Sequence, residues 1–121
     1  MTDMITMQVI RYGLEQVADE MGNTLIRTGR STIITEIKDI SCVVTDPAGQ
    51  TVAQAHHNPS LLAGFEITMK ALVRNYPPAE LAPGDVIITN DPYEGGQHIM
   101  DLYAIAPAFH DGKLIGFVGN I

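Results

Sequence analysis

The polar side chains best suited to chemistry gather in one run of sequence, TNDPYEGGQHIMD at residues 89–101. Within this run, His98 and Asp101 stand three positions apart. A neutral imidazole and a carboxylate at this spacing can reach one divalent ion, and zinc, manganese or iron would each accept the pair. A metal site ordinarily needs at least three protein donors. The sequence therefore predicts a candidate metal pair, with local hydrogen bonds inside a loop as the alternative role.

Asn90 and Asp91 open the same run and are candidate catalytic residues. The apolar residues 85–89 before them indicate a short strand, and Pro92 ends it. Both side chains therefore fall on a loop at a strand end, where functional residues often lie. There they would hold the loop or contact a substrate. The competing interpretation is that they only shape a turn.

Two other polar groups are weaker candidates. Residues 54–59, QAHHNP, contain adjacent histidines. Because neighbouring side chains on a strand point to opposite faces, at most one of them faces a given site. The same residues could equally form a polar loop that opens a helix. Asp39 belongs to a group with Arg27, Glu36 and Lys38 that would ordinarily be a solvated connection.

Composition limits the classes of function. Fourteen acidic against seven basic residues give a formal net charge of -7, which argues against nucleic acid as a partner. No apolar run approaches the roughly 20 residues of a membrane-spanning helix. The single cysteine, Cys42, lies in an apolar run typical of a buried hydrophobe rather than a nucleophile, and a cytoplasmic location fits best. No glycine-rich phosphate loop is present, so any ATP would be bound by another chain.

The element expected first is a long helix. It would begin at Asp3 or Thr6 and end near Gly29. Its apolar residues recur at helical spacing and predict one stripe that packs on the core: Ile10, Leu14, Val17, Met21 and Leu25. Gly13, inside this helix, suggests close packing at that point.

The rest of the chain alternates hairpins with one more helix. Strands at 40–45 and 50–55 form a hairpin, and a helix over 60–75 would pack through Leu62, Phe65, Met69, Leu72 and Val73. A strand at 85–89 precedes a second hairpin at 102–109 and 113–121. This order predicts an α+β fold of two helices with β-hairpins and a mixed sheet. Because the last residues still read as an apolar strand, we expect residues 1–121 to be the incomplete N-terminal portion of a larger subunit.

Several segments together resemble the hydantoinase B/oxoprolinase family. They are the opening helix with LIRT at 25–28, KDISC at 38–42, VAQA at 52–55, PGDV at 83–86, NDPYEGGQH at 90–98 with Asp101, and FHDGKLIGFVGN at 109–120. The resemblance runs in the family's order from about residue 6 to residue 121. The pattern N-D-P-Y-x-G-G-x-H-x-x-D is far more specific than its H-x-x-D core.

The resemblance implies one part of an ATP-dependent cyclic amidohydrolase that opens hydantoins, 5-oxoproline or related lactams. A hydantoinase A-type partner subunit would bind the ATP, so a hetero-oligomer is expected. His98 and Asp101 match metal ligands of the acetone carboxylase branch, in which a further histidine lies beyond the segment that this chain matches. A divalent manganese, zinc or iron ion there would act as a Lewis acid. Residues 1–121 alone are expected to be inactive and to bind metal weakly.

One segment departs from the family pattern. After the first hairpin, family members often read H-x-P-x-H-L-G, whereas HNPSL at residues 57–61 keeps the first histidine and has Leu61 in place of the second. We therefore take only His57 as a substrate-pocket residue, and Asp39 as a further polar candidate. Two alternative functions stay open. One is a subunit of the acetone or acetophenone carboxylase type, and the other is a non-catalytic fragment that assembles through an exposed strand.

Overall fold

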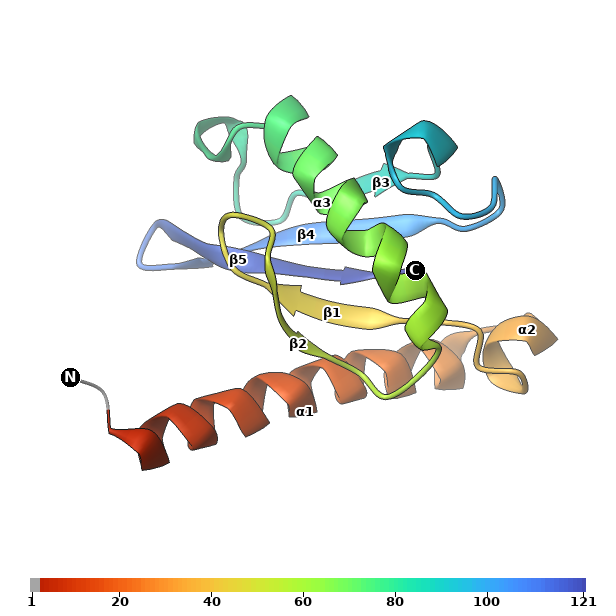
Figure 1. Ribbon diagram of the computed structural model, residues 1–121, viewed down its shortest axis with the longest axis horizontal. Helices are drawn as coiled ribbons and strands as arrows, with labels where there is room; N and C mark the ends of the chain where they lie inside the picture. Colours follow the sequence, from red (N-terminus) through yellow and green to blue (C-terminus); the bar gives the residue numbers. More distant parts are fainter. Residues whose placement is uncertain (1–2) are drawn as a thin grey trace.

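Five strands form one sheet in the computed structural model, which describes residues 3–121 (Figure 1). The strands are β1 (Cys42–Thr45), β2 (Thr51–Gln54), β3 (Ile87–Thr89), β4 (Tyr103–His110) and β5 (Lys113–Asn120). Their order across the sheet is β2-β1-β5-β4-β3, so the two predicted hairpins meet where β1 pairs with β5. The predicted α+β class is confirmed. All strand pairs among the described residues are antiparallel, whereas a mixed sheet was expected.

Tight turns explain why the pairing is antiparallel. In the first hairpin, Asp46 Oδ1 accepts hydrogen bonds from the backbone N–H groups of Ala48 and Gln50, each at 2.9 Å. In the second, Asp111 (φ +47°) and Gly112 (φ +74°) form a two-residue turn whose twist matches that of the paired strands. Chain reversals of this kind place neighbouring strands antiparallel, and parallel neighbours would need a long crossover instead.

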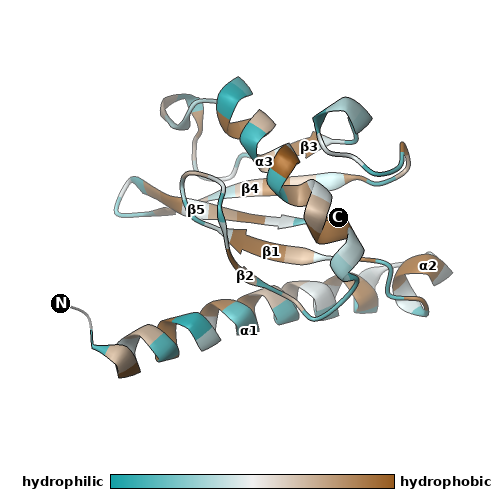
Figure 2. Cartoon of the chain, in the orientation of Figure 1, coloured by the Kyte–Doolittle hydropathy of each residue, from teal (hydrophilic) through white to brown (hydrophobic). Residues whose placement is uncertain are grey.

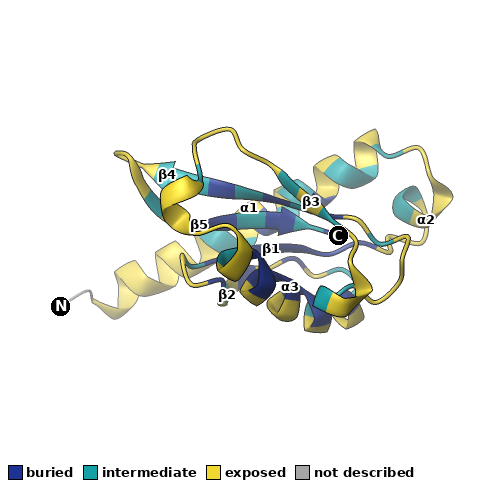
Figure 3. Cartoon of the chain, turned by 90° about the horizontal axis from the view of Figure 1, so that it is seen from above, coloured by how far each residue is buried: buried dark blue, intermediate teal, exposed yellow. Residues whose placement is uncertain are grey.

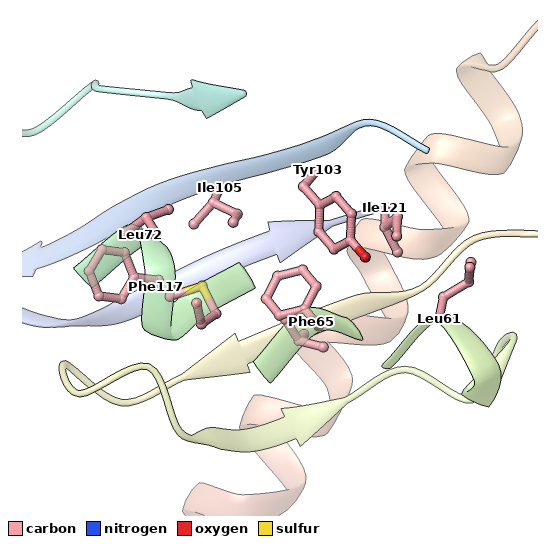
Figure 4. Packing of buried hydrophobic residues seen from close by; sticks show 9 residues of the cluster. Leu61, Phe65, Leu72, Tyr103, Ile105, Phe117 and Ile121 are labelled. Atoms are coloured by element: carbon pink, nitrogen blue, oxygen red, sulfur yellow. The ribbon is translucent and has the colours of Figure 1, made fainter. Parts of the chain in front are cut away.

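Helix α3 (Leu62–Asn75) covers one face of the sheet and forms the main core with it. It follows a short 3-10 turn, η1 (Pro59–Leu61), so the helix predicted over residues 60–75 is confirmed. Phe65, Met69 and Leu72 are buried as expected, and Leu62 and Val73 are half-buried beside them. Figure 4 shows the Phe65 ring beside Tyr103 of β4, with 5.7 Å between the ring centroids.

Helix α1 (Met4–Thr28) packs on the opposite face, mainly over β1 and β2 (Figures 1 and 3). Asp3 caps its start, accepting a hydrogen bond from the Thr6 N–H group at 2.8 Å. Gly29 caps its end, and its N–H group donates to the carbonyl of Leu25. Both predicted helix ends are therefore confirmed.

The side of α1 that packs on the sheet matches the predicted stripe in part. Leu14 and Met21 pack half-buried against the core, and Leu25 is half-buried as well. Ile10 and Val17 are 54% and 43% exposed, whereas Ala18 and Gly22 are buried. Small residues face the strands because they let the helix backbone come close to the sheet. At Gly22 an added Cβ would lie 2.4 Å from Cε1 of His57.

The first turns of α1 project beyond the sheet and are exposed (Figure 3). Apolar side chains occur on all sides of this part: Met4, Ile5, Met7, Val9, Ile10 and Tyr12. Figure 2 shows the resulting alternation of apolar and polar segments along the helix. A Cβ on Gly13 would meet nothing within 4 Å, so the expectation of close packing there is wrong for residues 3–121. Among residues 3–121, no helix is long and apolar enough to span a membrane.

The segment between α1 and β1 contains a short helix that the sequence did not predict. Helix α2 (Thr32–Thr35) begins after Ser31, whose Oγ accepts a hydrogen bond from the Ile33 N–H group at 3.3 Å. The charged side chains of this segment are exposed, as expected of a solvated connection. A second short element, the 3-10 turn η2 (Pro78–Glu80), follows α3. Helix α2 contains Ile33 and Ile34, which line a pocket beside His98 and Asp101.

Candidate functional site

The connection from β3 to β4 carries the candidate metal pair and rests against α3. Its 3-10 turn η3 (Pro92–Glu94) leads into Gly95, whose carbonyl oxygen would lie 2.3 Å from a Cβ added to Gly64. The Tyr103 hydroxyl donates to the same carbonyl at 3.0 Å, and Thr68 Oγ1 donates to the Glu94 carbonyl at 2.9 Å. Both hydroxyl-bearing residues are buried. Two glycines and two buried hydroxyl groups thus fix this loop to the core.

Asn90 and Asp91 hold the shape of the loop. Asn90 Nδ2 donates to the carbonyl of Ile99 at 2.8 Å and so ties the two ends of the loop together. Asp91 Oδ1 accepts from the Tyr93 N–H group at 2.9 Å and caps η3. These contacts hold the loop, which is one of the two roles that the sequence suggested for Asn90 and Asp91. A contact of either residue with a substrate stays a prediction.

His98 and Asp101 lie in direct contact. Asp101 Oδ2 is 2.9 Å from Nδ1 of His98 and also accepts the His98 backbone N–H group at 3.1 Å. A neutral imidazole that donates from Nδ1 to this carboxylate would leave the lone pair of Nε2 free. The His98 side chain is 65% exposed, whereas that of Asp101 is 18% exposed. The carboxylate therefore orients an imidazole that faces outward.

This pair fits part of a metal site. Imidazole nitrogen and carboxylate oxygen are the donors that zinc, manganese and iron accept, and a carboxylate on Nδ1 is the common way to orient a metal-binding histidine. In the hydrogen bonds described for residues 3–121, Asp101 uses only Oδ2. No group of three or more His, Cys, Asp or Glu side chains in this same range is placed to hold a metal. A complete site therefore needs at least one further donor.

The pair borders a pocket of about 550 Å³ that is lined by residues of β3, β4 and β5, of α2 and of the last turn of α1. Ile88 of β3 and Ala104 of β4 form its floor, and Ile33 and Ile34 of α2 form part of its wall. Besides His98 and Asp101, the polar side chains that line it are those of Ser31, Asp39 and Asn120. The pocket is mainly apolar, which is typical of small-molecule sites with a few convergent polar groups.

Asp39 is brought to this pocket by contacts that the sequence did not reveal. Its Oδ1 accepts from Nδ2 of Asn58 at 2.5 Å, and the fully buried Ser41 hydroxyl donates to the Asn58 carbonyl. The residue before it, Lys38, has a φ of +56°, which is uncommon for a residue with a side chain. The structure thus joins Asp39 with His98 and Asp101 around one pocket.

His57 lies apart from that group. It lines a separate, smaller hollow with His56, Asn58 and residues 37–39, so Asp39 borders both spaces. The His57 ring packs against Gly22 of α1, and its Nδ1 atom is buried with no hydrogen-bond partner among residues 3–121. The structure therefore does not bring His57 to the candidate metal pair, and a contact with substrate stays a prediction.

Cys42 is buried beneath α1, and burial raises the pKa of its thiol to about 11, with a smaller contribution from the Asp19 carboxylate. Because the thiolate is the reactive form, we expect thiol reagents at pH 8 to modify Cys42 only when the protein unfolds. The folded state favours the neutral thiol, so this contribution to stability is present below about pH 9 and is lost as pH rises through 11.

The measurement is the rate of labelling at pH 8 with and without urea. A Lys113→Cys variant supplies an exposed thiol on the second hairpin as the control. Labelling of Cys42 in the native protein at the rate of that control would contradict this account.

Part of the pocket wall was not predicted from the sequence. Ser31 and Asn120 line the pocket, as do the isoleucines of α2. Asn120 pairs with Ala104 across the predicted second hairpin, but the residues that close the pocket around it come from α2 and the β3–β4 connection, which no local pattern brings together. The cap at Ser31 was a usable signal, because a serine before a short apolar run is typical of a helix start.

Comparison with known proteins supports one family. The model of the hydantoinase B/oxoprolinase family matches residues 3–121. The chain is 36% identical to 5-oxoprolinase 1 of Arabidopsis thaliana over 98% of this chain and 9% of that protein. It is 35% identical to the B-type subunit of a putative D-/L-hydantoinase from a Pseudomonas species, over 95% of this chain and 20% of that protein.

Two solved structures are similar in fold. The ATP-dependent caprolactamase from Pseudomonas jessenii matches with a TM-score of 0.86 and 32% identity over 98% of this chain and 20% of that one. A nucleotide-free acetone carboxylase matches with a TM-score of 0.80, and its 23% identity supports the fold alone. The chain spans only about a tenth to a fifth of the length of these relatives. Because the family model matches almost every residue, the chain belongs to the hydantoinase B/oxoprolinase family.

Proposed function

We propose that residues 1–121 are the N-terminal part of the catalytic subunit of an ATP-dependent cyclic amidohydrolase, which opens hydantoin, 5-oxoproline or lactam rings. The observation that carries this proposal is the His98–Asp101 pair, 2.9 Å apart, beside a mainly apolar pocket of about 550 Å³. Family membership and the matches to ring-opening enzymes support the reaction class. A hydantoinase A-type partner would bind ATP, and the assembly would work in the cytoplasm.

A divalent metal would be held by His98 and Asp101, with a further donor from outside residues 1–121. Because Asp101 contacts Nδ1 of His98 here, the imidazole would have to turn so that one ring nitrogen and a carboxylate oxygen face the same ion. When bound, such an ion would polarise an amide oxygen as a Lewis acid. The chain's own residues would prepare this site. Asp101 positions the imidazole before the metal binds, Asn90 and Asp91 keep the loop in place, and the mainly apolar pocket would accept a substrate ring.

A carboxylase of the acetone type is the second candidate. The similarity to acetone carboxylase reaches 23% identity, whereas the caprolactamase reaches 32% and covers more of this chain. These figures favour hydrolysis. The two reactions differ in their products, since only carboxylation would fix labelled bicarbonate.

The test uses the full-length subunit assembled with its A-type partner. We expect near-stoichiometric metal by elemental analysis and ATP-dependent opening of a lactam or hydantoin ring. His98→Ala and Asp101→Ala should each remove most of the metal. Loss of Lewis-acid stabilisation, worth several kcal/mol, should lower turnover by at least about 100-fold.

His110→Ala is the matched control, because the His110 side chain is exposed at the turn of the second hairpin, with its Nε2 atom 3.6 Å from Oδ2 of Asp111. It should keep both metal and activity. Metal that persists in both site variants would refute the ligand assignment. Fixation of bicarbonate without ring opening would replace the hydrolase by the carboxylase.

A further inference from the structure

We propose that Glu94 is a positioning residue for the candidate metal pair. With Arg74 and Asn75 of α3 it forms a latch that fixes the connection carrying His98 and Asp101. This inference rests on the proposed function and adds to it a residue that touches neither metal nor substrate. Glu94 stands at a position that the pattern N-D-P-Y-x-G-G-x-H-x-x-D leaves open, so the latch is a feature of this chain.

The latch is a closed ring of three hydrogen bonds. Arg74 Nη2 donates to Oε1 of Glu94, and Asn75 Nδ2 donates to Oε2 at 3.2 Å. Arg74 Nε in turn donates to Oδ1 of Asn75 at 3.3 Å. Both carboxylate oxygens of Glu94 are therefore engaged, and each of the three side chains contacts the other two. Two of these bonds go to an ionised carboxylate, which makes them stronger than bonds between neutral groups.

The backbone of Glu94 is bound to the same helix, which separates this contact from an ordinary surface ion pair. An isolated exposed pair contributes little, because water screens it and two long side chains must be ordered. The Arg74 side chain is 66% exposed, whereas that of Glu94 is 33% exposed. The Glu94 carbonyl accepts the hydroxyl of buried Thr68, so this residue is fixed to α3 at two points. Less conformational freedom is then lost when its side chain binds.

The latch spans a place where apolar packing is thin. A hollow of about 270 Å³ lies between α3, β3 and η3, and its polar lining includes Asn75, Asp91 and Glu94. Side chains that face a hollow lack partner atoms on that side and lose the corresponding van der Waals contacts. Polar contacts therefore carry more of the attachment of η3 to the last turn of α3 than packing does.

The position of His98 depends on this attachment because the chain between them is flexible by composition. Gly95, with a φ of +107°, and Gly96 follow Glu94 directly. Glycine has access to more backbone conformations than any other residue. Residues 97–100 are all exposed, so packing does not restrict them. What holds the residue before the two glycines thus helps to decide where the imidazole lies.

A looser connection would lower metal affinity, because only molecules with both ligands in place bind the ion. The Tyr103 hydroxyl and the Gln97 side chain also hold this connection, so loss of the latch should loosen it without releasing it. We expect Glu94→Gln to weaken zinc binding by about three- to tenfold, less than the loss of a ligand would. Because the latch is partly exposed, salt should reduce this effect.

The test uses the full-length subunit assembled with its A-type partner and measures two properties. One is the affinity for Zn²⁺, by competition with a chelator. The other is hydrogen exchange of the backbone amides of residues 95–101 in the metal-free assembly, which reports local opening without any metal. Glu94→Gln should lower the affinity and speed the exchange by similar factors. Both effects should shrink between about 0.05 M and 0.5 M salt.

Arg74→Gln and the double variant with Glu94→Gln complete a double-mutant cycle. Once one partner is lost, loss of the second should change zinc affinity by less than about twofold, because the interaction is already broken. Glu66→Gln is the matched control, since it makes the same change of charge at an exposed position of α3. It should leave both zinc affinity and hydrogen exchange unchanged.

The outcomes separate this inference from the proposed function. Additive losses in the cycle would overturn the latch, and so would a Glu94→Gln assembly with the zinc affinity and hydrogen exchange of the parent. If the parent assembly takes up no metal, the metal assignment of the proposed function fails. Hydrogen exchange then decides whether Glu94 still fixes the connection. An assembly that shows the latch effects but opens no ring with ATP would refute the proposed function alone.

Discussion

Gly64→Ala is expected to destabilise the fold by about 1–3 kcal/mol and to displace the loop that carries His98 and Asp101. The added methyl group would stand 2.3 Å from the Gly95 carbonyl oxygen and 2.8 Å from the Tyr103 hydroxyl. Neither atom can move freely, because the hydroxyl donates to that same carbonyl. Relief of the clash therefore pushes the loop away from α3 and breaks a buried hydrogen bond.

Urea unfolding and metal content together measure this effect. Gly13→Ala is the control, because it makes the same change inside a helix where a Cβ meets nothing within 4 Å. It should stabilise the protein by about 0.5–1 kcal/mol, the gain from replacing glycine inside a helix. Equal effects of the two substitutions on stability would show that Gly64 is not a close-contact position.

Phe65→Ala should have the largest effect on stability, about 3–5 kcal/mol. Phe65 is 1% exposed and stacks beside Tyr103, and its Cζ would lie 2.4 Å from a Cβ added to Gly119 of β5. Its ring therefore fills the space between α3 and the two longest strands. Truncation would remove apolar burial and leave a cavity that these rigid elements cannot close.

The matched control is Ile67→Ala, two positions along the same helix, where the side chain is 55% exposed. It should change the free energy of unfolding by less than about 1 kcal/mol. Urea unfolding followed by circular dichroism measures both variants. A Phe65→Ala protein whose midpoint matches that of the control would contradict the core described for this face.

Local sequence patterns predicted the elements better than their faces. The two hairpins were predicted because each turn depends on residues close together in sequence. Asp46 accepts a hydrogen bond inside its own turn, and Gly112 adopts a positive φ. The buried side of α1 was predicted only in part. Leu14 and Met21 pack on the core as expected, but close approach to β1 and β2 selects Ala18 and Gly22 over a larger apolar residue such as Val17. A hydrophobic stripe cannot reveal a contact that depends on small size.

In the candidate site, contacts between residues close in sequence were likewise predicted, whereas contacts between distant segments were not. His98 and Asp101 are three residues apart, and this spacing predicted that their side chains lie together. That Asn90 shapes the same loop was also one of its predicted roles. The placement of Asp39 in the same pocket depends on pairing between distant strands and on the side chain of Asn58. The separation of His57 from the pair likewise follows from where α1 packs.

The strand order also has a consequence for how this part of the protein forms during synthesis. Each hairpin can close as soon as it leaves the ribosome, but β1 gains its second neighbour only when β5 emerges, since Thr45 pairs with Phe117. Until then the nascent chain keeps an unpaired edge on β1, and α3 lacks its contacts with Phe117 and Ile121. Ribosome pauses before residue 113 should therefore leave a chaperone-binding, protease-sensitive intermediate that pauses beyond β5 do not.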